Sequence, residues 1–381
     1  MKIKSIKANQ VFDSRANPTV EAIINNTAKA IAPSGKSTGI YEAKEVRDNK
    51  KDYFYGKSVE NAIKAIKRLS PKLKKTNTQR QFDTILKDNI DKIGSNGAIA
   101  LSMAYARLSK NLISYLNKQT KTKITTPVIM ANVINGGVHA KNKLKFQEFM
   151  ITPIKAKDQV QAIAEIYHIL KKQTKSYSLG DEGGLSIKNI DEKKALAMIE
   201  KAISKSSFTN KQIRIALDVA ASEFYRDEYY YLNKRLSAQQ LMDYYKKIIK
   251  DFKIYSIEDA FEQTDYVAWK EFTKKNKKLL IVGDDLTVSN KIFLQKAINN
   301  KLCNSIILKP NQVGTVTDSI ETIRLANKNK FKLIASHRSG DTEDAFIVDF
   351  AFAMGAKHMK IGAPCRGERT AKYNRFIELT K

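Results

Sequence analysis

Six short apolar runs in the second half of the chain each end in a residue that can take part in chemistry. Each run is rich in Ile, Leu and Val and stops at one charged or polar side chain: Asp218, Glu258, Asp284, Lys309, His337 or Lys360. Successive endpoints are 40, 26, 25, 28 and 23 residues apart. One charged strand end is common in any α/β protein, but six in register are not explained by packing. We therefore interpret them as one functional site.

The first three endpoints, Asp218, Glu258 and Asp284, can bind one hard divalent cation through their oxygen atoms. Magnesium suits such a set because it prefers oxygen ligands and keeps water or substrate oxygens in its remaining positions. Three close carboxylates also repel one another, which raises their pKa values and destabilises the site unless a cation lies between them. We therefore expect a metal at this position.

The fourth endpoint, Lys309, is expected close to that cation. A lysine beside positive charge loses part of its preference for the protonated form and can act as a general base near neutral pH. A base that faces a metal favours removal of a proton next to a carboxylate, with the metal stabilising the enolate that forms.

Two earlier motifs supply further polar groups. NGGVHAKNKLKFQEFMI contains His139 nine residues before Glu148, and SLGDEGGL places Asp181 and Glu182 beside two glycines. Glycines that flank an acid let the backbone approach a ligand closely, although a simple turn is the alternative reading.

The SHRSG segment supplies Arg338 and Ser339 at a strand end, where they could bind a phosphate group. Lys360 adds another cation on the same face. This set of charges fits a substrate that carries both a phosphate and a carboxylate.

The elements that must position these residues alternate between strands and helices. The segments between the apolar runs have helical periodicity, for example SAQQLMDYYKKIIKDF, NKIFLQKAINN and TDSIETIRLANKN. Such alternation predicts a parallel sheet, and this many units of about 25 residues favour a closed barrel whose strands carry the chemistry at their C-terminal ends.

Residues 1 to about 120 follow a different pattern. Strand-like segments at 2–14 and 19–33 precede helix-period stretches at 58–69 and 97–116, which predicts a small α+β unit. A polar stretch from Lys118 to Thr126 precedes Pro127 and suggests a boundary. We therefore expect an N-terminal α+β domain over residues 1–123 and a C-terminal barrel over residues 124–381.

The composition is that of an enzyme-sized globular chain. Its 381 residues are 42% hydrophobic, and no stretch approaches the ~18 apolar residues of a membrane-spanning helix. The N-terminus lacks the apolar core of a signal peptide, and two cysteines, Cys303 and Cys365, cannot form a disulfide framework. We expect a cytoplasmic protein without membrane association, in which both cysteines are buried small hydrophobes.

The net charge of +29 points to polyanions if it is taken alone. However, 55 of the 68 basic residues are lysines, and they are scattered through every predicted helix. Lysine is a hydrated point charge, whereas nucleic-acid readers usually depend on arginine. We favour a solvated surface, with nucleic-acid binding only weak and at low salt.

Two further motifs, for a P-loop and for a zinc site, are incomplete in this sequence. The PSGKSTG segment contains GKST, but a phosphate-binding P-loop needs a glycine where this chain has Ala30. The four histidines and two cysteines also lack the spacing of a zinc site.

The ordered motifs closely resemble the enolase family. They run from DSRANPTVE near the start through PSGKSTGIYEA, NGGVHAKNKLKFQEFMI, GDEGG, ALDVAASEFY, SIEDAF, VGDDLTVSN, ILKPNQVGT and ASHRSGDTEDAF to KIGAPCRGER. The resemblance implies a phosphopyruvate hydratase, a carbon–oxygen lyase of glycolysis and gluconeogenesis that dehydrates 2-phosphoglycerate to phosphoenolpyruvate. It also implies two Mg²⁺ ions, a barrel whose first strands depart from regular alternation, and a homo-oligomer.

The resemblance also assigns roles residue by residue. Asp218, Glu258 and Asp284 would hold the first magnesium, and Ser37 would help to recruit the second through the substrate phosphate. Lys309 resembles the base that acts on carbon 2, and Glu182 resembles the acid that protonates the leaving hydroxyl, assisted by Glu148. The positions that match substrate-binding residues are His139, Gln147, Glu148, His337, Arg338, Ser339 and Lys360, the last directed toward the substrate carboxylate.

The chain departs from the family pattern at a few positions. Ala16 stands where the family usually has glycine, and Lys36 and Tyr41 occupy loop positions more often filled by alanine and histidine. Two other readings stay open. One is a different metal-assisted proton-abstraction enzyme of the same superfamily, such as an acid-sugar dehydratase or racemase, and the other is a basic polyanion-binding protein.

Overall fold

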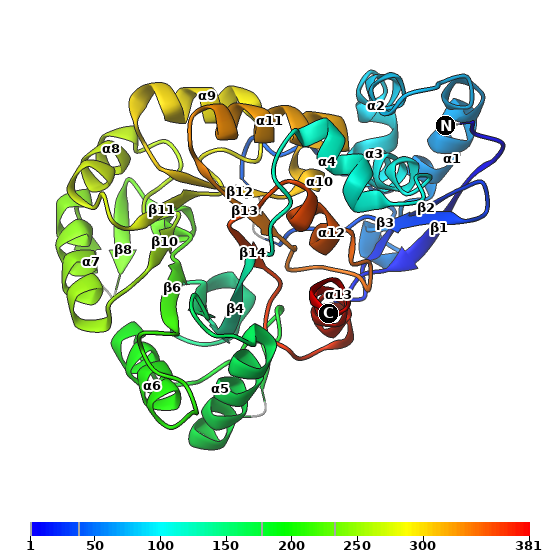
Figure 1. Ribbon diagram of the computed structural model, residues 1–381. Coiled ribbons are helices and arrows are strands. Elements are labelled where there is room, and N and C mark those ends of the chain that lie inside the picture. Colours follow the sequence, from blue (N-terminus) through cyan, green and yellow to red (C-terminus); the bar gives the residue numbers. More distant parts are fainter. Residues whose placement is uncertain (1, 37–38, 177, 232–233) are drawn as a thin grey trace.

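The computed structural model describes residues 2–36, 39–176, 178–231 and 234–381. Its N-terminal part is a three-stranded antiparallel sheet covered by helices, which Figure 1 places beside the barrel. The sheet and its helices consist of β1 (Ile6–Phe12), β2 (Pro18–Ile24), β3 (Ala28–Ile31), α1 (Glu60–Leu73), α2 (Gln79–Lys87), α3 (Ile90–Ala106) and α4 (Leu112–Thr120). The α+β unit predicted for this region is confirmed.

Helix α3 is buried along almost its whole length because it packs between β2, the helices α1 and α2 and the short helix α10 (Pro310–Val313) of the barrel. The sequence predicted a helix-period stretch over residues 97–116. In the structure this stretch belongs to two helices, since α3 ends at Ala106 and α4 begins at Leu112.

The second part is a closed barrel of eight strands in the order β10-β11-β12-β13-β14-β4-β5-β6. Its strands are β4 (Val128–Asn135), β5 (Glu148–Thr152), β6 (Arg214–Asp218), β10 (Ser256–Glu258), β11 (Leu280–Gly283), β12 (Ser305–Leu308), β13 (Lys332–Ser336) and β14 (His358–Lys360). Strand β5 is antiparallel to both of its neighbours, whereas the other pairs are parallel. The predicted barrel is therefore confirmed, together with the irregular first strands that the resemblance implied.

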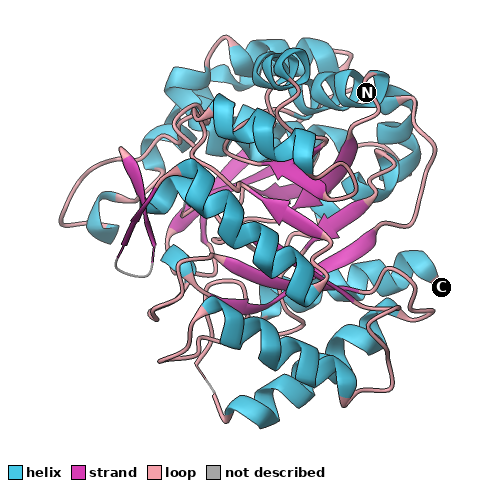
Figure 2. Cartoon of the chain, turned by 90° about the vertical axis from the view of Figure 1, so that its left-hand side faces the viewer, coloured by secondary structure: helices cyan, strands magenta, loops and turns pink. Residues whose placement is uncertain are grey.

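Helices surround the barrel strands, as Figure 2 shows. They are α5 (Gln159–Thr174), α6 (Glu192–Ser204), α7 (Ala238–Phe252), α8 (Tyr266–Lys275), α9 (Lys291–Asn300), α11 (Val316–Lys328), α12 (Phe346–Ala353) and α13 (Gly367–Thr380). The three helices predicted from periodicity correspond to α7, α9 and α11. A small antiparallel sheet, β7 (Tyr225–Arg226), β8 (Glu228–Tyr231) and β9 (Lys234–Leu236), lies outside the barrel.

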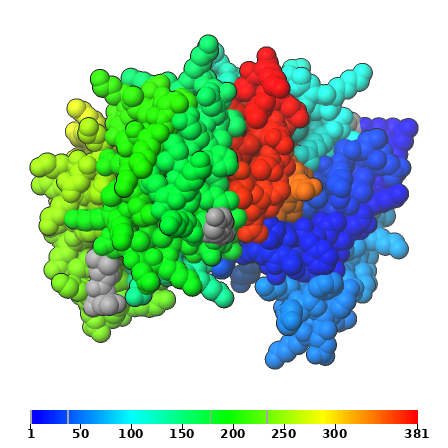
Figure 3. Space-filling view, turned by 90° about the horizontal axis from the view of Figure 1, so that it is seen from below, coloured from blue at the N-terminus to red at the C-terminus, as the bar shows by residue number. Residues whose placement is uncertain are grey.

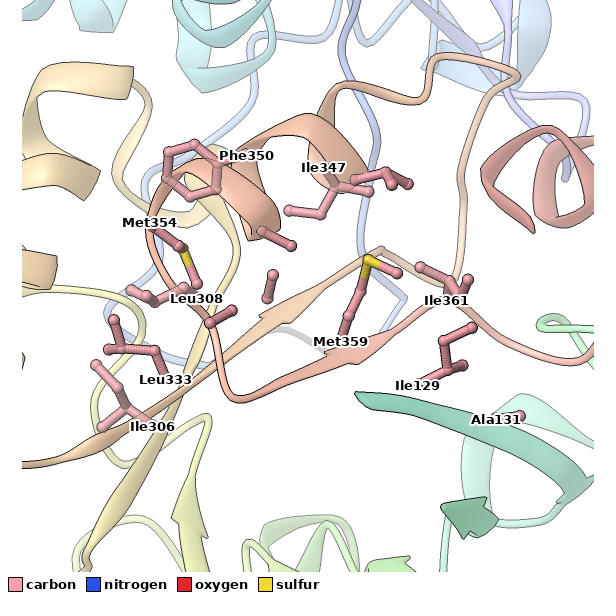
Figure 4. Packing of buried hydrophobic residues seen from close by; sticks show 14 of the residues in the cluster. Ile129, Ala131, Ile306, Leu308, Leu333, Ile347, Phe350, Met354, Met359 and Ile361 are labelled. Atoms are coloured by element: carbon pink, nitrogen blue, oxygen red, sulfur yellow. The ribbon is translucent and has the colours of Figure 1, made fainter. Parts of the chain in front are cut away.

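Alternation along each barrel strand separates two apolar cores. Ile306 and Leu308 pack outward against the helices (Figure 4), whereas Ile307, between them, points into the barrel. The inward cluster contains one residue from each of six strands: Met130, Met150, Ala216, Val282, Ile307 and Ile334. The same alternation decides which residues reach the mouth of the barrel.

The two parts of the chain are joined by partly buried polar contacts. Arg107, at the end of α3, donates two hydrogen bonds of 2.6 Å to the carboxylate of Asp344. Asp83 of α2 accepts hydrogen bonds from the backbone N–H and hydroxyl of Thr317 in α11, at 2.9 and 2.6 Å. Figure 3 shows helix α13, coloured red, between the barrel and the N-terminal sheet.

Within the described residues, no helix is both long enough and apolar enough to cross a membrane.

Candidate active site

The charged endpoints predicted from sequence lie at the C-terminal ends of the barrel strands. Asp218, Glu258 and Lys360 are the last residues of β6, β10 and β14, and Asp284, Lys309 and His337 follow β11, β12 and β13 directly. Each of Asp218, Asp284 and Lys309 stands two residues beyond an inward apolar side chain, at Ala216, Val282 and Ile307. The pleat of the strand therefore turns these side chains toward the axis of the barrel.

The remaining predicted residues come from loops and from the antiparallel strand. Glu148 begins β5, so the reversed direction of this strand brings it to the same mouth. His139 ends a short 3₁₀ helix (Gly137–His139), and Glu182 lies in the loop between α5 and α6. Nearly all predicted site residues are buried; Lys309 is half-buried, and Ser37 lies outside the described residues.

Lys360 lies among three carboxylates at the centre of the site. Its Nζ is 2.8 Å from Glu258, 3.1 Å from Glu148 and 3.4 Å from Asp218. Burial alone would lower the pKa of Lys360, but these carboxylates raise it well above its usual value. Burial, together with the charge of Asp218, raises the pKa of Glu258 well above its usual value. Three carboxyl groups therefore share one ammonium group at the centre of the site.

Lys309 is paired with Asp284 through a direct contact between Nζ and Oδ2. Burial acts to lower the pKa of Lys309, but Asp284 outweighs it and the net shift is upward. The sequence predicted a lowered pKa for this lysine, and the described contacts give the opposite direction because a carboxylate, not a cation, is its nearest charged partner. The same contact lowers the pKa of Asp284, although burial alone would raise it.

The three predicted metal ligands are not gathered into one tight group. Among the described residues, the groups of three whose ligand atoms lie within 4.8 Å of one another are His139–Glu148–Glu182 and Asp259–Asp284–Asp285. Asp218 and Glu258 are bridged by Lys360, whereas Asp284 is held by Lys309. In the second group, Asp259 accepts the backbone N–H groups of residues 284 and 285, so it caps a turn.

The pKa values of the neighbouring carboxyls of Glu148 and Glu182 are shifted in opposite directions. Burial and the charge of Glu182 raise the pKa of Glu148 well above its usual value. Burial alone would raise the pKa of Glu182 too, but His337 and His139 hold it well below. Glu182 Oε1 lies 3.4 Å from His337 Nε2 and 3.6 Å from His139 Nδ1. One carboxyl thus keeps a proton while its neighbour is ionised, which is an arrangement suited to acid–base chemistry.

Arg338, which we expect to bind the substrate phosphate, is held by a residue of the N-terminal part. Its guanidinium donates to both oxygens of Glu42, at 2.9 and 3.2 Å, and to Asn311 at 3.2 Å. Next to it, the hydroxyl of Ser339 accepts the backbone N–H of Lys36 at 2.9 Å. Residues 34–36 and 339–340 are also joined by two backbone hydrogen bonds between Ser34 and Gly340. Both parts of the chain therefore build this side of the site.

Comparison with known proteins agrees with this arrangement. Two family models match the chain: the enolase N-terminal domain over residues 3–115 and the enolase C-terminal TIM barrel domain over residues 123–381. A curated enolase from a Nitratiruptor species is 42% identical over 409 aligned positions, which cover 100% of this chain and 96% of that protein. The chain belongs to the enolase family. It is an enzyme with the activity of that family, a lyase.

Sequence reasoning missed several residues that complete this enolase site. Asn132 of β4 donates to Glu182 Oε2 at 2.9 Å, and Gln312 donates to Asp284 Oδ1 at 3.0 Å and to Glu42 at 3.1 Å. A signal for Asn132 was present, because a polar residue within the apolar run VIMANVIN, two positions after the inward Met130, must face the barrel axis. Glu42 gave no such signal because its partner is 296 residues away.

The positions at which this enolase departs from the family pattern have defined surroundings. Ala16 has a positive φ of 57°, which is the region that favours glycine. Lys36 Nζ pairs with Asp181 Oδ2 at 3.0 Å, next to Glu182. The ring of Tyr41 stacks on Phe293 with a centroid distance of 4.4 Å.

Proposed function

We propose that this enolase-family enzyme catalyses the reversible, magnesium-dependent dehydration of 2-phospho-D-glycerate to phosphoenolpyruvate and water. The observation that supports this most directly is a set of two lysines and five acids at the mouth of the barrel, all of them buried except the half-buried Lys309: Lys309, Lys360, Glu148, Glu182, Asp218, Glu258 and Asp284. Separate groups in it are available to take a proton, to give one and to bind a carboxylate.

The residues present fit a divalent cation. The donor atoms are carboxylate oxygens, which magnesium prefers, and burial together with the charge of Asp218 raises the pKa of Glu258, so a cation would stabilise the ionised form of this carboxyl. Asp218, Glu258 and Asp284 would hold the first ion, and Ser37 would contribute to the second through the substrate phosphate. Bound cations would offset the charge of these carboxylates, would weaken the pairing of Asp284 with Lys309 and would stabilise the negative charge of the enolate.

The side chains of the chain supply the proton transfers. The lone pair of Lys309 Nζ takes the proton from carbon 2, and the carbon–hydrogen electrons pass into the enolate of the carboxylate. As the double bond between carbons 2 and 3 forms, the carbon–oxygen bond at carbon 3 breaks, and Glu182 gives a proton to the leaving oxygen, which departs as water. Glu182 is ionised in the site without substrate, so the proton that it gives comes from Glu148, whose pKa is raised by burial and by Glu182 and whose carboxyl lies within 4.8 Å of that of Glu182.

Other side chains position the substrate. Lys360, now shared by three carboxylates, would bind the substrate carboxylate. Arg338 and Ser339 would bind the phosphate, and the buried His139, Gln147 and His337 would line the remaining surface. Because Arg338 is already fixed in two hydrogen bonds by Glu42, its guanidinium loses little freedom when the phosphate arrives.

The test is an assay of the purified protein with 2-phosphoglycerate and Mg²⁺, followed by the absorbance of phosphoenolpyruvate. We expect turnover that EDTA abolishes and Mg²⁺ restores. A parallel screen of non-phosphorylated hydroxy acids and acid sugars separates the alternative superfamily activity. Turnover of those acids without turnover of 2-phosphoglycerate would overturn the proposal.

We also propose that the domains divide between residues 123 and 124, that the enzyme acts in the cytoplasm and that nucleic acid binds only weakly at low salt.

We further propose that the enzyme is a homo-oligomer, a dimer or higher. An exposed group of aromatic residues on the N-terminal part supports this. Tyr55 is 94% exposed, Phe12 is 56% exposed, and the ring of Phe12 contacts Phe54 at 5.6 Å. Tyr55→Ser is expected to weaken self-association in sedimentation velocity, and an unchanged distribution of species would argue against this face.

A further inference from the structure

Arg369 of helix α13 is completely buried and joins two loops of the active site. Its Nη1 donates to the carbonyl of Arg338 at 2.7 Å and contacts the Nδ1 atom of His337 at 2.6 Å. Its Nη2 donates to the carbonyls of Ser339 at 2.8 Å and of Asp181 at 3.0 Å. One guanidinium thus holds the segment after β13 against the loop that carries Glu182.

The contact with Nδ1 decides which nitrogen of His337 carries the proton. An arginine side chain can donate hydrogen bonds but cannot accept one, so Nδ1 must be the acceptor. A neutral imidazole has one N–H, and this leaves the proton on Nε2. Burial, followed by the charge of Arg369, lowers the pKa of His337 to about 4, so the ring is neutral near pH 7. Nδ1 therefore accepts a hydrogen bond, while Nε2 carries the proton.

The Nε2 atom of His337 lies close to the proposed acid. Nε2 lies 3.4 Å from Glu182 Oε1 and makes no hydrogen bond within the part of the chain that the structure describes. The side chain of His337 is 1% exposed. Because a buried N–H without a hydrogen bond is costly, this group is available to Glu182 or to a substrate oxygen in the site.

The charge of Arg369 is balanced by two carboxylates. Its Nη1 is 3.5 Å from Asp341, and its Nε is 3.4 Å from Glu368. Asp341 is shared with the buried Lys372 at 3.1 Å. These partners fix the plane of the guanidinium, so its forked donors meet three carbonyls and one ring nitrogen at the same time.

We propose that Arg369 is a positioning residue of the reaction: it fixes His337 as the Nε2–H tautomer that faces Glu182 and keeps the two loops in register. The link to catalysis rests on the proposed function, whereas the tautomer of His337 does not. Arg369 itself touches no proposed reacting atom.

The first experiment measures the tautomer in the wild-type protein without substrate. The chain has only four histidines, so ¹⁵N-histidine NMR gives a simple spectrum, and the signals missing from His337→Gln identify His337. We expect the signature of a protonated Nε2 and an unprotonated Nδ1 at pH 7. A protonated Nδ1 would overturn the proposal, whatever activity the protein has.

The second experiment uses Arg369→Lys, which keeps the positive charge but removes the planar set of guanidinium N–H donors. We expect a mixture of tautomers at His337 and a fall in kcat of roughly 10- to 100-fold, as for other partners that fix functional histidines, with a smaller change in KM. Arg375→Lys is the matched control, because Arg375 lies on the same helix and pairs with Asp349 at 2.5 Å. A folded Arg369→Lys enzyme with wild-type kcat would overturn the proposal. If this variant does not fold, the wild-type spectrum still decides.

Discussion

Lys360 shows how a single buried charge holds the site together. It is the common partner of Glu148, Asp218 and Glu258, and it is almost fully removed from water. Without it, three buried carboxylates would face one another with no ammonium between them. Breaking a buried ion pair by removal of one partner costs far more than the loss of a surface pair, because it leaves an uncompensated charge.

We expect the single substitution Lys360→Met to lower the free energy of unfolding by about 3–5 kcal/mol at neutral pH. The loss should shrink as the pH falls, because the carboxyls of Glu148 and Glu258, whose pKa values are raised, take up protons in the folded state. Urea unfolding without metal or substrate measures it. The matched control is Lys357→Met, which changes an exposed lysine next to the same strand. Equal stability of the two variants would contradict this role.

Among the elements, the turn before β2 contains a local strain. Ala16 has a φ of 57°, a conformation that costs a residue with a Cβ roughly 1–2 kcal/mol. Its neighbours fix the turn, since the side chain of Asp13 accepts the backbone N–H groups of Arg15 and Asn17 at 2.8 and 2.9 Å. The chain therefore maintains a turn that glycine would adopt with less strain.

We expect Ala16→Gly to raise the free energy of unfolding by about 0.5–1 kcal/mol, because glycine adopts a positive φ without a steric penalty. Ala8→Gly is the control, since Ala8 lies within the extended strand β1, where glycine should lower stability by a similar amount. Thermal unfolding of both variants measures whether stability rises for Ala16→Gly and falls for Ala8→Gly. A decrease for Ala16→Gly would show that the Cβ is favourable there.

The parts of the fold and site that depend on a single element could be predicted from the sequence, whereas those that depend on two elements could not. The apolar runs that end in Asp218, Asp284 and Lys309 correctly predicted strands with these residues at their C-terminal ends, because each position depends only on its own strand. The upward pKa shift of Lys309 in the site without a cation could not be predicted, because it depends on which side chain of a neighbouring strand is nearest, and a single strand does not contain that information. The Glu42–Arg338 pair was missed for the same reason, since it depends on how the two parts dock.

Over the whole molecule, Asp83 links the N-terminal part to the barrel. It is buried and accepts hydrogen bonds from Ser102, Gln79 and both donors of Thr317. Burial raises the pKa of Asp83 to about 6, although these donors act in the opposite direction. A raised pKa in the folded state means that Asp83 contributes stability at low pH and loses it as the pH rises through about 6.

We therefore expect the stability of the wild type, measured relative to Asp83→Asn, to fall by about 1 kcal/mol between pH 5 and pH 7.5. The asparagine does not titrate, so the difference between the two proteins isolates this carboxyl. Urea unfolding at a series of pH values measures it. A difference that stays constant across this range would show that Asp83 keeps the same charge in the folded and unfolded chain.

The assignment of Lys309 as base and Glu182 as acid is tested most directly by exchange of the carbon 2 hydrogen of 2-phosphoglycerate with D₂O. We expect the wild type and Glu182→Gln to exchange this hydrogen, although Glu182→Gln forms little phosphoenolpyruvate. In Lys309→Ala we expect exchange to fall by at least ~10²-fold, because no other group removes the proton. Exchange at the wild-type rate in Lys309→Ala would contradict the assignment.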